Sequence, residues 1–206
     1  MGKRLLPFRQ YNEHDVINMF ALEDASVNEN ITGFGAGDAG VFVKVSAGNL
    51  DLDPVTYGTN SYLGKTDYPF VGSNQYPSVS LKVTPTVSGD VQPLGITLFE
   101  TAKFDENGEK LLYYKQKAMD YQALLPGQAV PVVTRGVFTL SSRAYDGVLT
   151  VGSGFKLSPS GAGKVTGVAL SDSASIGSVL ATGSRGANGA TIADSFSGNY
   201  AIIKLG

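Results

Sequence analysis

Short runs of β-branched and aromatic residues, separated by turns that contain glycine, recur along this chain. Val41–Val45 is one such run, and Val79–Val83 alternates between apolar and polar residues. A period of two places apolar side chains on one face of a strand, and β-branched residues fit the pleated backbone. Short strands with polar glycine turns are typical of β-sandwiches and barrels. The pattern predicts an all-β fold, a barrel or sandwich of short antiparallel strands.

The second half of the chain continues this pattern. Its expected strands are Val130–Leu140, Val148–Val151, Phe155–Leu157, Lys164–Leu170, Ser178–Leu180 and Tyr200–Leu205. Upstream, Gly95–Phe104 and Lys110–Tyr114 are predicted to pair as a long β-hairpin. Asn107-Gly108 lies between them and supplies the positive φ that a hairpin turn requires.

Helical and linking segments are few. Glu13–Leu22 is the best helix candidate, because Val16, Ile17 and Phe20 fall on one helical face. Ala118–Leu125 is a candidate helical turn, and the glycines of residues 23–40 predict a linker. We therefore expect three parts. They are an N-terminal arm with its linker (1–38), a β domain or insertion with the long hairpin (39–126), and a C-terminal barrel-like domain (127–206).

Composition argues against several classes of partner. Only 17% of the 206 residues are charged and the formal net charge is −2, so no broad basic surface is expected to hold nucleic acid. No apolar run approaches the roughly 20 residues of a membrane helix. The N-terminus lacks the apolar stretch of a secretory signal, because Pro7 and Arg9 interrupt it. We expect a soluble protein made inside the cell, with no direct contact to nucleic acid or membrane.

The residues that carry chemistry are scarce. Cysteine is absent, which removes thiolate nucleophiles and cysteine-bound metals, and His14 is the only histidine. The neighbouring acids Asp105 and Glu106 lie in a turn-like context, and adjacent residues of a strand point to opposite faces. Gly161–Lys164 departs from the phosphate-loop pattern on both sides. The sequence predicts no enzyme, no cofactor and no metal site.

Two segments are candidates for recognition. Tyr57–Tyr76 is rich in aromatic residues, which suit either sugar stacking or a Tyr-rich protein interface. Only Lys65 and Asp67 lie among these aromatic residues, so an interface is favoured. Lys3–Tyr11 mixes cationic and apolar side chains, and Pro7 pushes the preceding residue into an extended conformation. That mixture predicts an extended arm that lies on the surface of another protein.

Both ends of the chain resemble phage proteins. Lys3–Tyr11, continuing into Asp15–Leu22, resembles virion structural proteins of marine, cyanobacterium-infecting tailed phages. The second half resembles phage head-decoration proteins more broadly. The segments that carry this likeness are Gly127–Val132, Gly136–Leu140, Ile176–Leu180 and Ile202–Leu205.

The resemblance implies a function without chemistry. Proteins of this kind are small β-barrels or sandwiches that bind the outside of an expanded head, commonly as homotrimers, and cement the major capsid protein lattice. The residues then expected to bind the capsid are Lys3, Arg4, Leu5, Leu6, Pro7, Phe8, Arg9, Tyr11, Val16, Ile17 and Phe20. On this hypothesis, deletion of residues 1–22 leaves the β domain folded and abolishes capsid binding.

Two other functions fit the same composition. One is a different virion component, such as a tail, fibre or head-completion protein. The other is a carbohydrate-binding module built on a β-sandwich, with the Tyr57–Tyr76 segment as its sugar site.

Overall fold

The fold is described from a computed structural model of the chain. It describes all residues except 1–2, 49–78, 80, 88, 91 and 187–196. Strands account for 43% of the residues, arranged in three sheets, and the described part of the chain has a single short α-helix. The predicted all-β fold is therefore confirmed.

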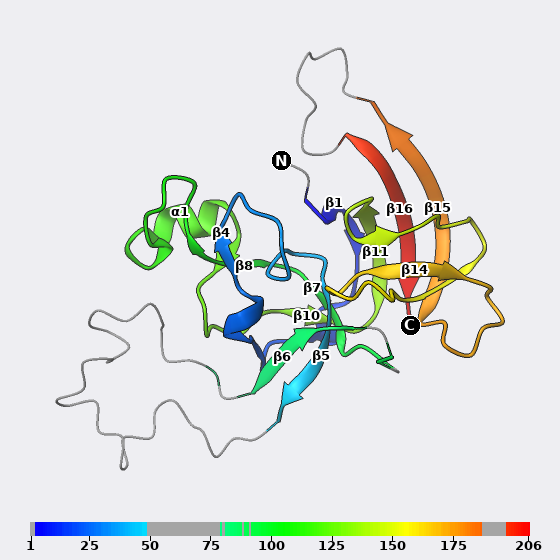
Figure 1. The fold of residues 1–206 in the computed structure, drawn as a ribbon, viewed down its shortest axis with the longest axis horizontal. Coiled ribbons are helices and arrows are strands. Elements are labelled where there is room, and N and C mark those ends of the chain that lie inside the picture. The colour runs from blue at the N-terminus through cyan, green and yellow to red at the C-terminus, as the bar shows by residue number, and fades with distance from the viewer. Residues whose placement is uncertain (1–2, 49–78, 80, 88, 91, 187–196) are drawn as a thin grey trace.

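The largest sheet has seven strands. Their order is β1 (Leu5–Gln10), β11 (Gly136–Ser141), β16 (Gly198–Leu205), β15 (Gly177–Arg185), β13 (Gly154–Leu157), β14 (Val165–Val168) and β12 (Tyr145–Asp146). Neighbours run antiparallel, except that β12 and β14 are parallel. The long, curved β15 and β16 dominate this sheet (Figure 1).

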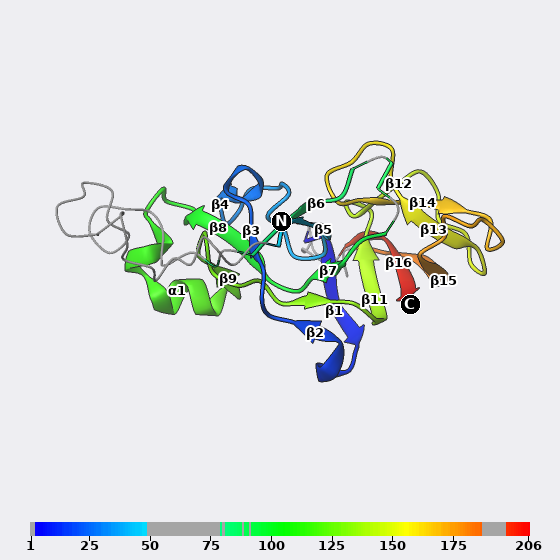
Figure 2. The ribbon, with the colours of Figure 1, turned by 90° about the horizontal axis from the view of Figure 1, so that it is seen from below.

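Two smaller sheets complete the fold. The six-stranded sheet has the order β2 (Val16–Ile17), β10 (Val132–Val133), β7 (Gly95–Thr97), β5 (Phe42–Ala47), β6 (Lys82–Pro85) and β3 (Ala21–Leu22). The three-stranded sheet consists of β4 (Asn28–Asn30), β8 (Glu100–Phe104) and β9 (Ala123–Leu124). The α-helix α1 is Lys115–Asp120, and 3-10 helices cover Glu13–Asp15, Asp24–Ser26 and Leu111–Tyr113. Figure 2 shows α1 and the three-stranded sheet at one end of the molecule and β12 to β15 at the other.

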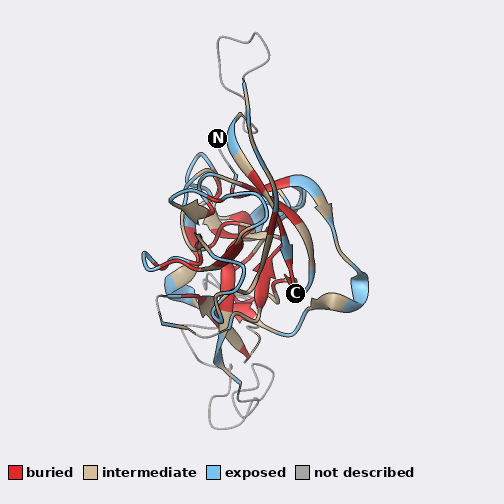
Figure 3. Cartoon of the chain, turned by 90° about the vertical axis from the view of Figure 1, so that its right-hand side faces the viewer, coloured by how far each residue is buried: buried red, intermediate tan, exposed pale blue. Residues whose placement is uncertain are grey.

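The two larger sheets share one hydrophobic core. Phe138 and Ile203 of the seven-stranded sheet are fully buried in the same cluster as Phe42 and Ile96 of the six-stranded sheet. The rings of Phe42 and Phe155 meet edge to face with centroids 6.2 Å apart. Buried residues fill the region between the sheets (Figure 3). This packing is compatible with the predicted barrel or sandwich.

The shared core does not follow the predicted domain boundaries. It combines Leu5 from the first predicted part, Phe42 and Ile96 from the second, and Phe138 from the third. Leu5 is only 5% exposed and β1 pairs with β11, so the N-terminal segment belongs to the sheet. Deletion of residues 1–22 would remove three strands, so the structure leads us to expect that this deletion destabilises the β domain.

The predicted N-terminal helix is also wrong. Asn12 accepts a hydrogen bond from the backbone N–H of His14 at 3.0 Å and caps a single 3-10 turn. The chain then becomes extended, and Val16 and Ile17 pair with β10. Pairing with a distant strand overrides a weak helical pattern, because isolated short helices are marginal and β-branched residues suit strands. The predicted linker 23–40 contains β4, which pairs with β8.

The predicted hairpin is confirmed only at its turn. Gly108 has a φ of 82°, and the carboxylate of Asp105 accepts backbone hydrogen bonds from Asn107 and Glu109. The returning segment makes one isolated bridge to β8 and then becomes helical, first as a 3-10 turn and then as α1. The candidate helical turn is therefore displaced, since α1 precedes most of residues 118–125. Val148–Val151 is not a strand, because residues 148–150 have no regular secondary structure and Val151 begins a turn.

The turn between β13 and β14 joins the two large sheets. The backbone N–H of Gly163 donates to the Thr86 carbonyl at 3.0 Å, and the Gly163 carbonyl accepts from Phe42 N–H at 2.9 Å. Gly163 has a φ of +65°, and an added Cβ would lie 2.2 Å from a Val41 methyl. A side chain there would therefore separate the sheets.

We predict that Gly163→Ala destabilises the protein more than Gly152→Ala. Gly152 also has positive φ (+78°), but nothing lies within 4 Å of its added Cβ. Both variants lose roughly 1 kcal/mol from the left-handed backbone. Gly163→Ala is expected to lose a further ~1–3 kcal/mol from overpacking. Urea denaturation measures both values, and equal losses would show that the contact at Gly163 is unimportant.

Candidate functional site

Strand β1 is an edge strand of the seven-stranded sheet. Among the described strands it pairs only with β11. Leu5 is opposite Leu140 and Arg9 is opposite Phe138, so β1 has two more residues between these pairs than β11 has. Pro7 lies in this irregular stretch, and edge strands and bulges are where sheets tolerate a residue without an N–H. The predicted extended conformation is present, but its first partner is this chain's own sheet.

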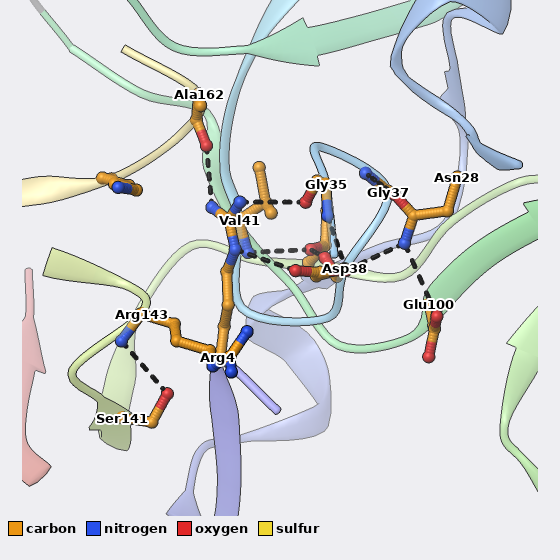
Figure 4. A network of polar contacts seen from close by, with 12 residues as sticks. Arg4, Asn28, Gly35, Gly37, Asp38, Val41, Glu100, Ser141, Arg143 and Ala162 are labelled. Atoms are coloured by element: carbon orange, nitrogen blue, oxygen red, sulfur yellow. Dashed lines mark hydrogen bonds and ion pairs between the residues drawn. The ribbon is translucent and has the colours of Figure 1, made fainter. Parts of the chain in front are cut away.

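Arg4 fixes the start of β1 to two other segments. Its side chain is buried, and Nε donates to Oδ2 of Asp38 at 2.9 Å. Nη1 donates to the Ala162 carbonyl at 2.8 Å and Nη2 donates to the Gly35 carbonyl at 2.9 Å. Figure 4 shows these three directions from one guanidinium. A planar fork of five donors suits this role, whereas a lysine ammonium does not.

Hydrogen bonds to Asp38 connect the Arg4 side chain to Asn28 of strand β4. Asp38 Oδ1 accepts hydrogen bonds from Asn28 Nδ2 at 2.8 Å and from the Gly35 backbone N–H at 3.2 Å. Asn28 Oδ1 accepts from Gly37 N–H at 3.0 Å, and Asn28 Nδ2 lies 3.5 Å from a carboxylate oxygen of Glu100 (Figure 4). A buried ion pair needs further hydrogen bonds to offset its desolvation, and both carboxylate oxygens of Asp38 have partners.

Glu100, the first residue of β8, ends this network. Burial raises the pKa of its carboxyl group to about 7, and the nearby negative charge of Asp38 adds to the rise. The hydrogen bond from Asn28 and the positive charge of Lys3 act in the opposite direction and lower the pKa. Glu100 therefore changes its charge near neutral pH.

A cavity of about 320 Å³ runs beside β1, and we call it the edge cavity. One wall consists of Lys3, Arg4, Leu5, Leu6, Pro7 and Arg9. The facing wall includes Ile31–Phe34, Leu98, Glu100, Tyr121 and Gln122. Three of the lining residues, Leu5, Leu6 and Pro7, are the first residues of β1, so the cavity lies beside the beginning of this strand.

A second hollow of about 320 Å³ adjoins β1, and we call it the hairpin groove. Its lining residues are Leu6, Pro7, Phe8, Thr139, Ser184, Arg185, Tyr200 and Ile202, which come from β1, β11, β15 and β16. The Phe8 side chain is 69% exposed. The Tyr200 ring covers Gly183, whose added Cβ would lie 2.6 Å from the tyrosine oxygen. Five of the groove's eight lining residues are apolar or aromatic, and Arg185 is the charged one.

The structure brings together only part of the predicted capsid-binding set. Lys3, Arg4, Leu5, Leu6, Pro7 and Arg9 line the edge cavity, and Phe8 lies in the hairpin groove. The remaining four residues lie elsewhere. Tyr11 stacks on Phe138 with ring centroids 6.2 Å apart, Val16 and Ile17 pair with β10, and Phe20 packs against the second core cluster.

Burial divides residues 3–9, at the start of β1 and just before it, between two roles. Arg4, Leu5 and Leu6 are 5–6% exposed and support the fold of this chain. They cannot also be surface anchors for another protein. Lys3, Pro7 and Phe8 are exposed and Arg9 is half-buried, so these four side chains remain accessible for binding.

The facing wall of the edge cavity was not predicted from the sequence. Ile31–Phe34 and Asp38 fall in the segment predicted to be a linker, and Glu100 falls in the predicted hairpin. Gln122 has a φ of 52°, an unusual conformation for a residue other than glycine. No local pattern marks these positions, because their shared site arises from chain crossings more than 60 residues apart.

The described residues contain no group of three or more His, Cys, Asp or Glu side chains that could hold a metal ion. His14 is exposed in its 3-10 turn. Within the same residues, no helix is long and apolar enough to cross a membrane. The predicted aromatic segment Tyr57–Tyr76 lies outside the described part of the chain.

Comparisons of this chain with protein families, curated proteins and solved structures found no match. The accessible residues of the predicted arm lie together at β1 and line its two adjoining hollows.

We predict that Arg4→Met destabilises the fold by about 3–5 kcal/mol, because it leaves the buried Asp38 carboxylate without its cation. The double variant Arg4→Met/Asp38→Asn is expected to recover part of this loss. Urea denaturation of the two single variants and the double variant measures the coupling. A loss below about 1 kcal/mol for Arg4→Met would mean that Arg4 does not hold the N-terminal strand.

We predict that stability falls as pH rises through 7 and that Glu100→Gln removes most of this fall. The raised pKa means that the folded protein binds this proton more tightly than the unfolded chain does. The stabilisation is therefore complete below the ordinary carboxyl pKa and is lost as pH rises through about 7. Urea midpoints between pH 5 and 8 test this, with the exposed Glu29→Gln as control. Parallel profiles for wild type and Glu100→Gln would contradict it.

Proposed function

We propose that the protein is a structural virion protein that binds the outer surface of a tailed-phage head and stabilises the capsid lattice. The likeness of residues 3–22 to virion proteins of cyanobacterial phages supports this function. The observation that carries it is the arrangement of β1. Arg4 fixes the strand internally, while Lys3 and Phe8 remain exposed and Arg9 is half-buried.

Exposed apolar groups favour a contact with protein. Phe8 is 69% exposed and Phe34 is 52% exposed, and they lie in the hairpin groove and the edge cavity respectively. The Arg143 guanidinium stacks 3.6 Å from the centre of the Phe34 ring. Aromatic residues and arginine are enriched in protein interfaces, where they supply much of the binding energy. The major capsid protein is the partner of this surface.

An ordered strand is an efficient binding element. A free arm would lose conformational entropy when it binds, on the order of 1–2 kcal/mol per residue for the backbone. Pairing with β11 fixes β1 before it meets the capsid. This preorganisation leaves more of the contact energy for affinity. The extended arm predicted from the sequence would therefore bind as a strand that already belongs to this chain's own sheet.

Self-association, as a homotrimer, is part of the proposal. Beyond the pairing of Gly183 with Tyr200, β15 and β16 form a two-stranded ribbon that projects from the body (Figure 1). None of residues 180–186 is buried, and this part of the hairpin is drawn as intermediate or exposed in Figure 3. Two-stranded ribbons are marginally stable alone. Contact with a second copy on the capsid exterior would stabilise the hairpin.

We predict that the protein co-sediments with expanded, undecorated heads of its own phage at a fixed ratio to the major capsid protein. Phe8→Ala is expected to weaken this binding by about tenfold or more, because aromatic anchors at interface centres contribute roughly 2 kcal/mol or more. The decorated heads should also resist heat better than undecorated heads.

Val148→Ala is the matched control, because Val148 is 82% exposed but lies outside both hollows of β1. It should bind like the wild type. If folded protein, verified by circular dichroism, fails to bind heads, the cement function is wrong. A site on the tail or fibre would then be the better hypothesis.

A further inference from the structure

We propose that the edge cavity accepts an extended, acidic segment of a partner protein, which adds to β1 as a further strand. The inference deepens the proposed function and depends on it only in expecting this partner on the phage head. It reverses the direction of the predicted contact. The N-terminal segment of this chain would receive a strand rather than donate one.

The backbone of β1 is the first element of this site. The strand has β11 on one side and, among the described strands, no partner on the other. The edge cavity lies beside the beginning of this strand, where Leu5, Leu6 and Pro7 line it. An edge strand presents backbone N–H and C=O groups to which an extended peptide can pair.

The facing wall supplies space for alternate side chains. Ile31, Leu98 and Tyr121 give it an apolar surface. The cavity volume of about 320 Å³ lies at the lower end of the range for ligand pockets, roughly 300–1,000 Å³. A peptide that pairs with β1 would point every second side chain towards this wall, because strand side chains alternate.

The charged residues that line the cavity determine which charge a bound partner segment should carry. Lys3 and Arg9 form no ion pair with any described residue, whereas Arg4 is neutralised by Asp38. Glu100 is the remaining charged group, and its raised pKa of about 7 reduces its negative charge at neutral pH. The cavity is therefore net positive. Complementary charge favours a carboxylate-bearing segment and disfavours a basic one.

Gln122 adds a side chain to the wall from an unusual backbone position. It follows the C-terminal end of α1, with a φ of 52°. Glycine is the usual residue at such a position, because the left-handed conformation is strained for side-chain-bearing residues. Gln122→Gly should therefore preserve the fold while it removes part of the cavity wall.

The test is a selection of displayed random decapeptides on the full-length protein. Peptides that alternate apolar and acidic residues should be enriched. Their binding should fall about tenfold or more with Lys3→Glu/Arg9→Glu, because the charge reversal repels them. Lys204→Glu, an exposed cation of β16 outside both hollows, is the control and should bind like the wild type. No enrichment, or enrichment of peptides that bind the charge-reversed variant equally, overturns the proposal.

Hydrogen exchange locates the bound peptide. A selected peptide should slow amide exchange of Leu6 and of residues 8–10 in the wild type and have a smaller effect in Gln122→Gly. Protection confined to the hairpin groove or to another surface would overturn the assignment to the edge cavity. So would self-association of the free protein that Lys3→Glu/Arg9→Glu abolishes, since a second copy would then be the occupant.

The peptide selection tests the acceptor site and the head-binding experiment tests the cement function, so the two proposals can be rejected separately. Acidic peptides that protect β1, together with no binding to heads, would retain the acceptor site and reject the cement function. Binding to heads that survives Lys3→Glu/Arg9→Glu but is lost with Phe8→Ala would retain the cement function and reject the acceptor site. The hairpin groove would then be the capsid contact.

Discussion

The buried ion pair between Arg4 and Asp38 is the contact on which the arrangement of the N-terminal strand depends. The Arg4 guanidinium connects the start of β1 to the loop before β5. Through the Ala162 carbonyl it also connects β1 to the turn that joins the two large sheets. Burying both charges costs desolvation energy, so such a pair is weak evidence for added stability. Its clearer effect is positional, because the donors of one rigid guanidinium hold the start of β1 to the loop at Gly35–Asp38 and to the turn at Ala162 (Figure 4).

This anchoring separates two roles within one short strand. Arg4, Leu5 and Leu6 point into the protein, while Lys3, Pro7 and Phe8 remain exposed. A mobile arm could not keep these groups in a fixed register. Once β1 is held by β11 and by Arg4, its outward groups lie at constant positions beside the edge cavity and the hairpin groove. The same contacts that complete the fold therefore prepare the surface for binding.

The sequence predicts what local pattern controls. Strands such as β5, β13 and β16 were found from the alternation and apolar content of their own residues. The helix over 13–22 was wrong because Val16 and Ile17 pair with β10, more than 100 residues away. The extended form of the arm was correct, but its buried side chains reflect pairing with β11. The cavity wall could not be predicted, because it gathers loop, strand and helix-end residues that share no motif.

An open strand edge is also a hazard, because it can pair with any exposed edge and lead to aggregation. The features of β1 that limit this hazard are the ones that would make it selective. Pro7 removes one backbone donor, and the irregular pairing between Leu5 and Arg9 interrupts a flat edge. Lys3 and Arg9 would repel the basic edge of a second copy of β1. Protection against self-pairing and preference for an acidic partner thus come from the same charges, since specificity requires both repulsion and attraction.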